Sequence, residues 1–213
     1  MALPPLIEKS QRDWLFKVTK ELSTQAERDV CLLAFFFGSA CTTIQINRMH
    51  LKDILHKSGR FNSEFKIRGS DHTFYFESKL LRELTTNYLK WRLKNKIGLG
   101  PDPDKYLGLD PDEHLFISYQ NKCFSITKKI TTKGNISYSC DALNRHIKHL
   151  MKQAGIENAS ILSGRRTFAV TLRRKGFDVA HIHALLGNKT LETTLKLLTT
   201  DPVSMGDIAK QAF

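Results

Sequence analysis

Basic side chains stand at both ends of one segment near the C-terminus of this 213-residue chain. Arg165 and Arg166 open the segment, and Arg173 and Arg174 close it. A guanidinium group can bind a phosphate through two parallel hydrogen bonds, and the N-terminus of a helix favours an anion. The segment therefore indicates a phosphate-bearing partner, with Arg165 the best placed to contact it. The alternative is that Arg165 pairs with a carboxylate inside the fold.

The residues around these arginines predict three consecutive short helices. Ser163, Asp178 and Thr190 can cap helix N-termini. Gly176 and Gly187 can end helices in the left-handed conformation. Apolar residues between them recur at helical spacing, so each helix gains one buried face. The predicted helices are Gly164–Lys175, the segment from Asp178 to Gly187, and the segment from Thr190 to about Leu198.

The motif in this region resembles the C-terminal part of a tyrosine recombinase (phage integrase) catalytic domain. Its residues are Ser163-Gly164-Arg165-Arg166-Thr167-Phe168-Ala169, followed by Leu186-Gly187 and Thr193-Thr194. The resemblance implies that Arg165 stands at the position of the family's second catalytic arginine. A weaker likeness at Gly38–Ile46 resembles the segment that carries the family's first catalytic arginine, and the whole resemblance covers about residues 20–200.

The same resemblance implies that most catalytic positions have changed. Family enzymes attack a DNA phosphate with a tyrosine oxygen, while arginines, histidines and a lysine stabilise charge and transfer a proton. The matching positions hold Thr42 for the first arginine, Ser70 for the lysine, Leu162 for the first histidine, Asn188 for the second histidine or tryptophan, and Leu197 for the tyrosine. Because leucine has no nucleophilic atom, we expect no cleavage of DNA.

The overall charge also favours a nucleic-acid partner. Lys and Arg number 33 against 21 Asp and Glu, which gives a formal net charge of +12. Less frequent explanations are an anionic membrane surface, an acidic protein or merely a basic soluble surface. No apolar run approaches the roughly 20 residues of a membrane span, and the N-terminus is no signal peptide. We therefore expect a cytoplasmic, nucleoid-associated bacterial protein without membrane contact. The cysteines lack metal-ligand spacing, so neither a metal nor a cofactor is predicted.

The predicted fold is mainly α with a small antiparallel β-sheet (α+β), like a tyrosine recombinase catalytic domain. Residues 1–22 are expected to form an N-terminal lead-in, and residues 23–213 a single domain with a C-terminal tail and no separate core-binding domain. Further helices are predicted at Gln25–Phe37, Ser78–Asn95 and Cys140–Ala154. Short strands are predicted at Phe65–Ile67, Thr73–Phe76, His114–Ser118 and Phe124–Thr127, and the basic segment 128–135 is expected to be exposed.

Double-stranded DNA is the predicted partner, and its predicted contacts are Arg165, Arg166, Lys66, Arg68, Lys128, Lys129, Lys133, Arg173 and Arg174. The favoured hypothesis is a catalytically inactive recombinase-like DNA-binding protein, a regulator or accessory factor of a mobile element or phage. One alternative is an active recombinase with relocated residues, marked by a tyrosine near Arg165 in space. Another is a protein–protein module of a recombinase complex. The C-terminal tail after Pro202 could dock on a second copy or on a recombinase partner.

Overall fold

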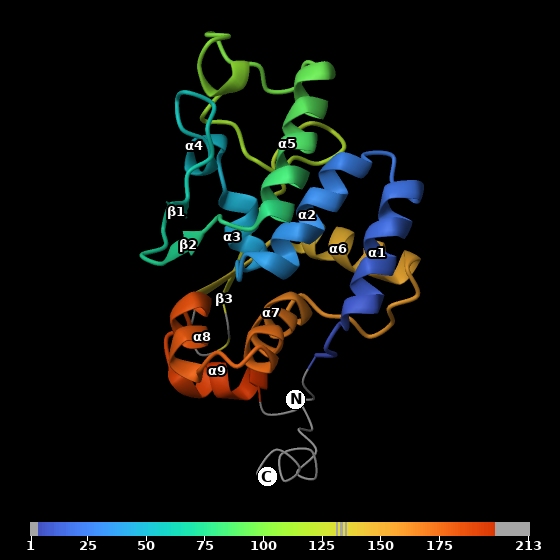
Figure 1. Cartoon of the computed structure of the whole chain (residues 1–213), viewed down its shortest axis with the longest axis vertical. Coiled ribbons are helices and arrows are strands. Elements are labelled where there is room, and N and C mark those ends of the chain that lie inside the picture. The colour runs from blue at the N-terminus through green and yellow to red at the C-terminus, as the bar shows by residue number, and fades with distance from the viewer. Residues whose placement is uncertain (1–3, 131, 133, 135, 199–213) are drawn as a thin grey trace.

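The apolar helix α2 (Ala26–Gly38) lies at the centre of the fold in the computed structural model (Figure 1). Its side chains from Cys31 to Phe37 are all buried, because this run is apolar on every face. Helices α1 (Lys9–Leu22), α5 (Lys79–Lys94) and α7 (Ser163–Arg174) pack directly against it. The structure describes residues 4–130, 132, 134 and 136–198.

Two hydrophobic clusters hold the helices together. The larger cluster joins α1, α2, α5 and α6 (Asp141–Gln153). The smaller cluster lies among α7, α8 (Val179–Leu186) and α9 (Leu191–Leu198), which gather at one end of the molecule in Figure 1. Gly164 lets α7 approach α2 so closely that an added β-carbon would lie 2.3 Å from the carbonyl oxygen of Phe36. The three C-terminal helices are therefore fixed to the central helix.

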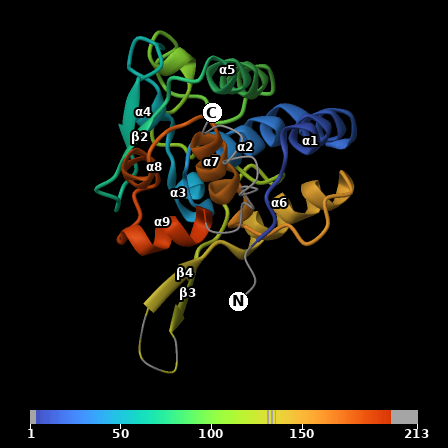
Figure 2. The same cartoon turned by 60° about the horizontal axis from the view of Figure 1, so that its bottom comes forward.

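The strands form two separate antiparallel hairpins. In the first, β1 (Glu64–Lys66) pairs with β2 (Thr73–Tyr75). In the second, β3 (Thr127–Ile130) pairs with β4 (Ile136–Ser139), and Figure 2 shows this hairpin projecting from the body of the molecule. The short elements between α2 and α6 are α3 (Thr43–Arg48), α4 (Leu51–Ile54) and the 3₁₀-helix η1 (Tyr106–Gly108).

The predicted fold class is confirmed, because helices dominate and the few strands are antiparallel. The predicted helices at Gln25–Phe37, Ser78–Asn95, Cys140–Ala154 and Gly164–Lys175 correspond to α2, α5, α6 and α7, with ends that shift by one residue. The two further C-terminal helices correspond to α8 and α9. The one small sheet that was expected is instead two hairpins that do not pair with each other.

Two predicted strands are wrong. The segment His114–Ser118 makes only one isolated bridge, from His114 to His50, and its Leu115 and Phe116 side chains pack into the larger cluster. The segment Phe124–Thr127 contributes only its last residue to a strand. The described residues of the basic segment that follows are exposed, as predicted, and 128–130 belong to β3 of the hairpin, where Gly134 adopts a φ of 77°.

The chain before α2 packs into the same unit as the helices that follow. Residues 9–22, part of the expected lead-in, form α1, which packs on α2 and α6. Leu15 of α1 and Ile7 before it are buried in the larger cluster. The backbone N–H of Ile7 also donates to Thr167 Oγ1 of α7 at 3.1 Å. The N-terminal segment is thus held against α7.

Candidate nucleic-acid interface

A groove of about 550 Å³ lies between α3, the β1–β2 turn, strand β4 and the residue that follows Asn188. Its polar lining consists of hydroxyl, amide and cationic side chains, namely Thr42, Gln45, Arg48, Arg68, Ser70, Ser137, Tyr138 and Lys189. Because these residues come from four distant segments of the chain, the groove exists only in the folded protein.

The ends of α3 are fixed at the groove by local hydrogen bonds and by one ring contact. Gln45 N–H donates to Thr42 Oγ1 at 3.3 Å, and Thr42 N–H donates to Gln45 Oε1 at 2.8 Å. This capping box starts the helix at Thr42, the position that the sequence resemblance assigns to the family's first arginine. At the other end of α3, the guanidinium of Arg48 lies 5.6 Å from the ring centroid of Tyr138. Helix α3 is therefore tied to the β3–β4 hairpin.

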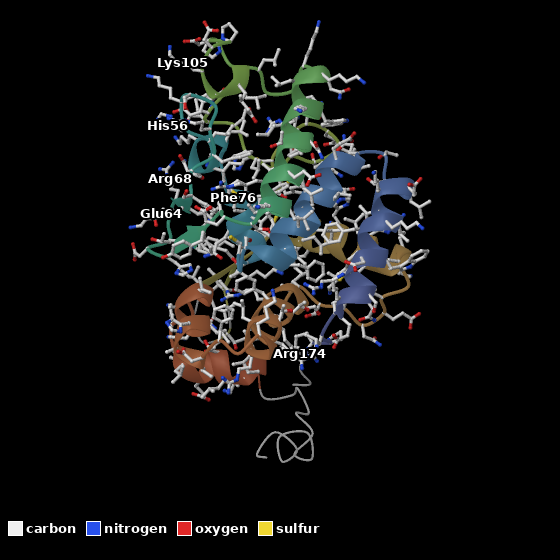
Figure 3. The ribbon with its side chains drawn as sticks, in the orientation of Figure 1. His56, Glu64, Arg68, Phe76, Lys105 and Arg174 are labelled. Atoms are coloured by element: carbon white, nitrogen blue, oxygen red, sulfur yellow. The ribbon has the colours of Figure 1, made fainter. Side chains whose placement is uncertain are left out.

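The cations of the groove form no ion pair with an acidic side chain of the described residues. Within the described residues, Arg48, Arg68 and Lys189 have no carboxylate partner. Cations without counter-charges on a concave surface attract anions from solution. Arg68, labelled in Figure 3 at the β1–β2 hairpin, was predicted from the sequence. Arg48 and Lys189 were missed, and their signals were slight: Arg48 ends a capped short helix, and Lys189 directly follows Asn188.

His72 fixes the β1–β2 hairpin against the end of α8. Its Nε2 lies 3.1 Å from the carbonyl oxygen of Leu185, and its ring packs on Gly187. An added β-carbon at Gly187 would lie 2.5 Å from His72 Cγ, and the residue has a φ of 60°. Glycine meets both requirements, the left-handed backbone and the close approach. This contact places the turn that contains Ser70 beside Lys189 in the groove.

Arg165 is half-buried and is held by neutral groups. Its Nη2 donates to the carbonyl oxygen of Leu186 at 2.6 Å and to Asn188 Oδ1 at 2.7 Å. Asn188 Nδ2 in turn donates to Thr194 Oγ1 at 2.9 Å. The Nε of Arg165 is buried and has no hydrogen-bond acceptor among the described residues. Since Asn188 immediately precedes Lys189, Arg165 is linked to the edge of the groove.

The electrostatics of Arg165 suit an anion. Burial lowers the pKa of its guanidinium, yet arginine keeps its charge in proteins. The predicted alternative, a carboxylate partner inside the fold, is not found among the residues that the structure describes. An oriented, charged group with an unused donor is costly to bury unless a ligand completes its hydrogen bonds. This arrangement is able to bind a phosphate oxygen.

The other positions that the sequence resemblance assigns to the family's active site carry neutral side chains in different environments. Leu197, at the tyrosine position, is 8% exposed and belongs to the smaller hydrophobic cluster. Leu162, at the first histidine position, is exposed at the start of α7. Thr42 and Ser70 line the groove and contribute only hydroxyl groups. The structure thus gathers Thr42 and Ser70 in one place but presents no reactive side chain at Leu197.

Two predicted DNA contacts make other interactions. Arg166 is 5% exposed, and its guanidinium donates to the carbonyl oxygens of Pro4 and Leu197. A side chain held in the interior cannot reach DNA, so the burial of Arg166 argues against the predicted contact. Arg174, labelled in Figure 3, forms an ion pair with Glu8 at 2.8 Å on the surface.

The remaining predicted contacts within the described residues are exposed cations. Lys66 lies on β1, and Lys128 and Lys129 lie on β3, where Lys129 pairs with Asp141 at 3.0 Å. Arg173 lies at the C-terminal end of α7. Lys133 and the tail after Pro202 lie outside the described residues. Across the described helices, none combines the length and the apolar character needed to cross a membrane.

Solved structures of recombinases share this fold. The XerA recombinase matches with a TM-score of 0.71 and 17% identity, over 100% of this chain and 64% of that chain. The XerH site-specific recombinase bound to its palindromic difH substrate matches with a TM-score of 0.65 and 15% identity, over 98% of this chain and 53% of that chain. The Tn1549 transposon integrase in complex with transposon right end DNA matches with a TM-score of 0.58 and 12% identity, over 100% of this chain and 68% of that chain. No protein-family model and no curated protein matches the sequence.

These matches show that the chain has the fold of a tyrosine recombinase catalytic domain. The resemblance inferred from the motif at Ser163–Ala169 is therefore confirmed at the level of the fold. The chain spans 64% of the length of the XerA recombinase and 53% of the XerH chain.

Proposed function

We propose that this chain is a catalytically inactive, tyrosine-recombinase-like protein that binds duplex DNA through its basic groove. One observation carries the proposal: Arg48, Arg68 and Lys189 converge in a single groove without carboxylate partners among the described residues. Arg165 adds an incompletely hydrogen-bonded guanidinium next to it. Such a surface matches the regularly spaced phosphates of a duplex, which supply most of the affinity in non-specific DNA binding.

The absence of catalysis follows from the chemistry that the family's route needs. A nucleophilic oxygen must attack the phosphorus atom, and the leaving oxygen must receive a proton. Leu197 has no such oxygen and is packed in the smaller cluster. Thr42 and Ser70 replace the charged groups that would stabilise the transition state, and neutral hydroxyl groups are weaker at this task. A regulator of a mobile element or phage, or an accessory factor for an active recombinase, requires DNA binding without these groups.

One observation favours a second candidate, an active recombinase with relocated residues. Tyr138 lines the same groove, is 48% exposed and lies under the guanidinium of Arg48. In such an enzyme Tyr138 Oη would lose its proton, bond to the phosphorus and expel the 5′-oxygen of the next nucleotide. That oxygen would take up a proton, and Lys189 is a lysine of the groove lining that could donate it. The product would be a 3′-phosphotyrosine that Tyr138→Phe abolishes.

The experiment that tests the proposal is a binding titration of labelled duplexes, each about 30 base pairs long, across a range of salt concentrations. We expect affinity that falls steeply with salt, with a log–log slope of several units. No binding to any duplex at low salt would contradict the proposal. Salt-insensitive binding to a recombinase, without retention of DNA, would instead support the protein–protein module.

A further inference from the structure

The β3–β4 hairpin is a ribbon whose two faces differ in chemistry. Directly opposite residues in an antiparallel pair share a face, and residues two apart along a strand also share it. Lys128 is opposite Tyr138, and Ile130 is opposite Ile136, so these four side chains share one face. The other face carries Lys129 and its neighbours, and Lys129 forms an ion pair with Asp141 at 3.0 Å.

The Tyr138 face of the ribbon continues the basic groove. Ile136 and Tyr138 line the groove, and Tyr138 lies against Arg48 of α3. From there the same face extends outward along the projecting ribbon seen in Figure 2. A long molecule that leaves the groove on the side of β4 would continue along this face.

The same face is apolar and cationic at once, without being covered by the rest of the described chain. Ile130 is 66% exposed and Ile136 is 55% exposed. An exposed apolar pair on a projecting hairpin is available for contact with a partner. Lys128, between them and the body, has no carboxylate partner among the described residues. An apolar pair beside such a cation suits a partner that offers both methyl groups and phosphates.

We propose that this ribbon lies in the major groove of DNA, with Ile130 and Ile136 against the C5-methyl groups of thymines and Lys128 toward a phosphate. This inference rests on the proposed DNA binding, and it identifies the ribbon as the part of the chain that contacts the bases. The major groove of B-DNA is about 12 Å wide and admits a two-stranded ribbon. It is also where thymine displays its methyl group, with which apolar side chains make specific contacts.

Uracil supplies the sharpest test, because it pairs as thymine does but lacks the C5-methyl group. The full chain is titrated with one A·T-rich duplex of about 30 base pairs and with the same duplex in which every thymine is replaced by uracil. The variant is the double substitution Ile130→Ser and Ile136→Ser, which leaves no methyl group at either position to contact a thymine. The control is Thr127→Ser, which removes a methyl group from the opposite face of the ribbon.

The wild-type chain should bind the uracil duplex roughly fourfold more weakly for each thymine methyl group that the isoleucines cover, the effect of burying one such group. The double variant should bind both duplexes with equal affinity, while Thr127→Ser should behave as the wild type. Equal affinity of the wild-type chain for both duplexes, or unchanged discrimination in the double variant, overturns the assignment and leaves salt-dependent DNA binding intact. Failure to bind either duplex overturns the proposed function itself.

A second copy of the chain is the other occupant that the apolar face could accept. Sedimentation of the wild-type chain and the double variant distinguishes this case. If the two isoleucines mediate self-association and the thymine preference is absent, the ribbon is an interface between copies, and the assignment to DNA is overturned. Equal melting temperatures of the wild type and both variants are expected, because the substituted side chains are exposed.

Discussion

Replacing Arg48, Arg68 and Lys189 together with alanine should flatten the salt dependence of DNA binding. Each neutralised phosphate contributes about 0.9 to the log–log slope, so removing three cations that each meet a phosphate reduces the slope by about 2.7. Between about 50 and 200 mM salt, the wild-type affinity should therefore fall by about 40-fold more than that of the triple variant. Fluorescence anisotropy with a labelled duplex over this range measures both slopes.

The control for this experiment removes the same charge from a different surface. Lys79, Lys90 and Lys94 are exposed on α5, which contributes no residue to the groove. The triple substitution of these lysines by alanine should leave the slope within about one unit of the wild type, because general attraction is screened over about 10 Å at about 0.1 M salt. If both triple variants flatten the slope equally, or if neither does, the groove is not where the chain meets phosphates.

Further predictions concern single positions. Arg165→Ala should weaken DNA binding by about 1–3 kcal/mol, the scale of a charge-assisted contact, whereas the paired change Arg173→Ala and Arg174→Ala should cost less and mainly at low salt. A lower melting temperature with unchanged affinity would make Arg165 a structural residue. Lys128→Ala should weaken DNA binding, whereas Lys129→Ala should not, because among the described residues only Lys129 is paired with a carboxylate. A titration in which the two substitutions weaken binding equally would contradict the assignment of the two faces. Leu197→Tyr should restore no cleavage of DNA, which covalent trapping measures. It should also destabilise the fold by about 1–3 kcal/mol, because the larger side chain overfills a packed site, and thermal unfolding measures this loss.

Local signals predicted the helices well, because capping and helix ends are decided by neighbouring residues. The capping box of Thr42 and Gln45, the cap at Asp178 and the left-handed Gly187 all lie where the sequence indicated. Each of these features involves side chains within about four residues of the backbone groups that they satisfy. The motif at Ser163–Ala169 then identified the fold, since it fixes how α7 packs on its neighbours.

The groove could not be predicted in the same way, because it joins residues far apart in the chain. Arg48 of α3 meets Tyr138 of β4, and Lys189 joins them from the segment after α8. The sequence also did not indicate that Arg165 and Arg166 have different environments. Successive helix residues point about 100° apart, so one arginine faces Asn188 and the other enters the interior. The β3–β4 ribbon escaped prediction because its isoleucines are exposed, contrary to the usual burial of apolar residues.

The measurement that tests the central claim most directly combines binding and covalent trapping in one reaction. The chain is incubated at low salt with a nicked suicide duplex, which lets the cleaved fragment diffuse away and so traps any covalent 3′-phosphotyrosine. One half of the reaction is run on a native gel and the other half on a denaturing gel. DNA binding without catalysis predicts a retarded complex on the native gel and no protein–DNA adduct on the denaturing gel. An adduct that survives denaturation and maps to any tyrosine, Tyr138 above all, would contradict the claim, and so would the absence of a retarded complex.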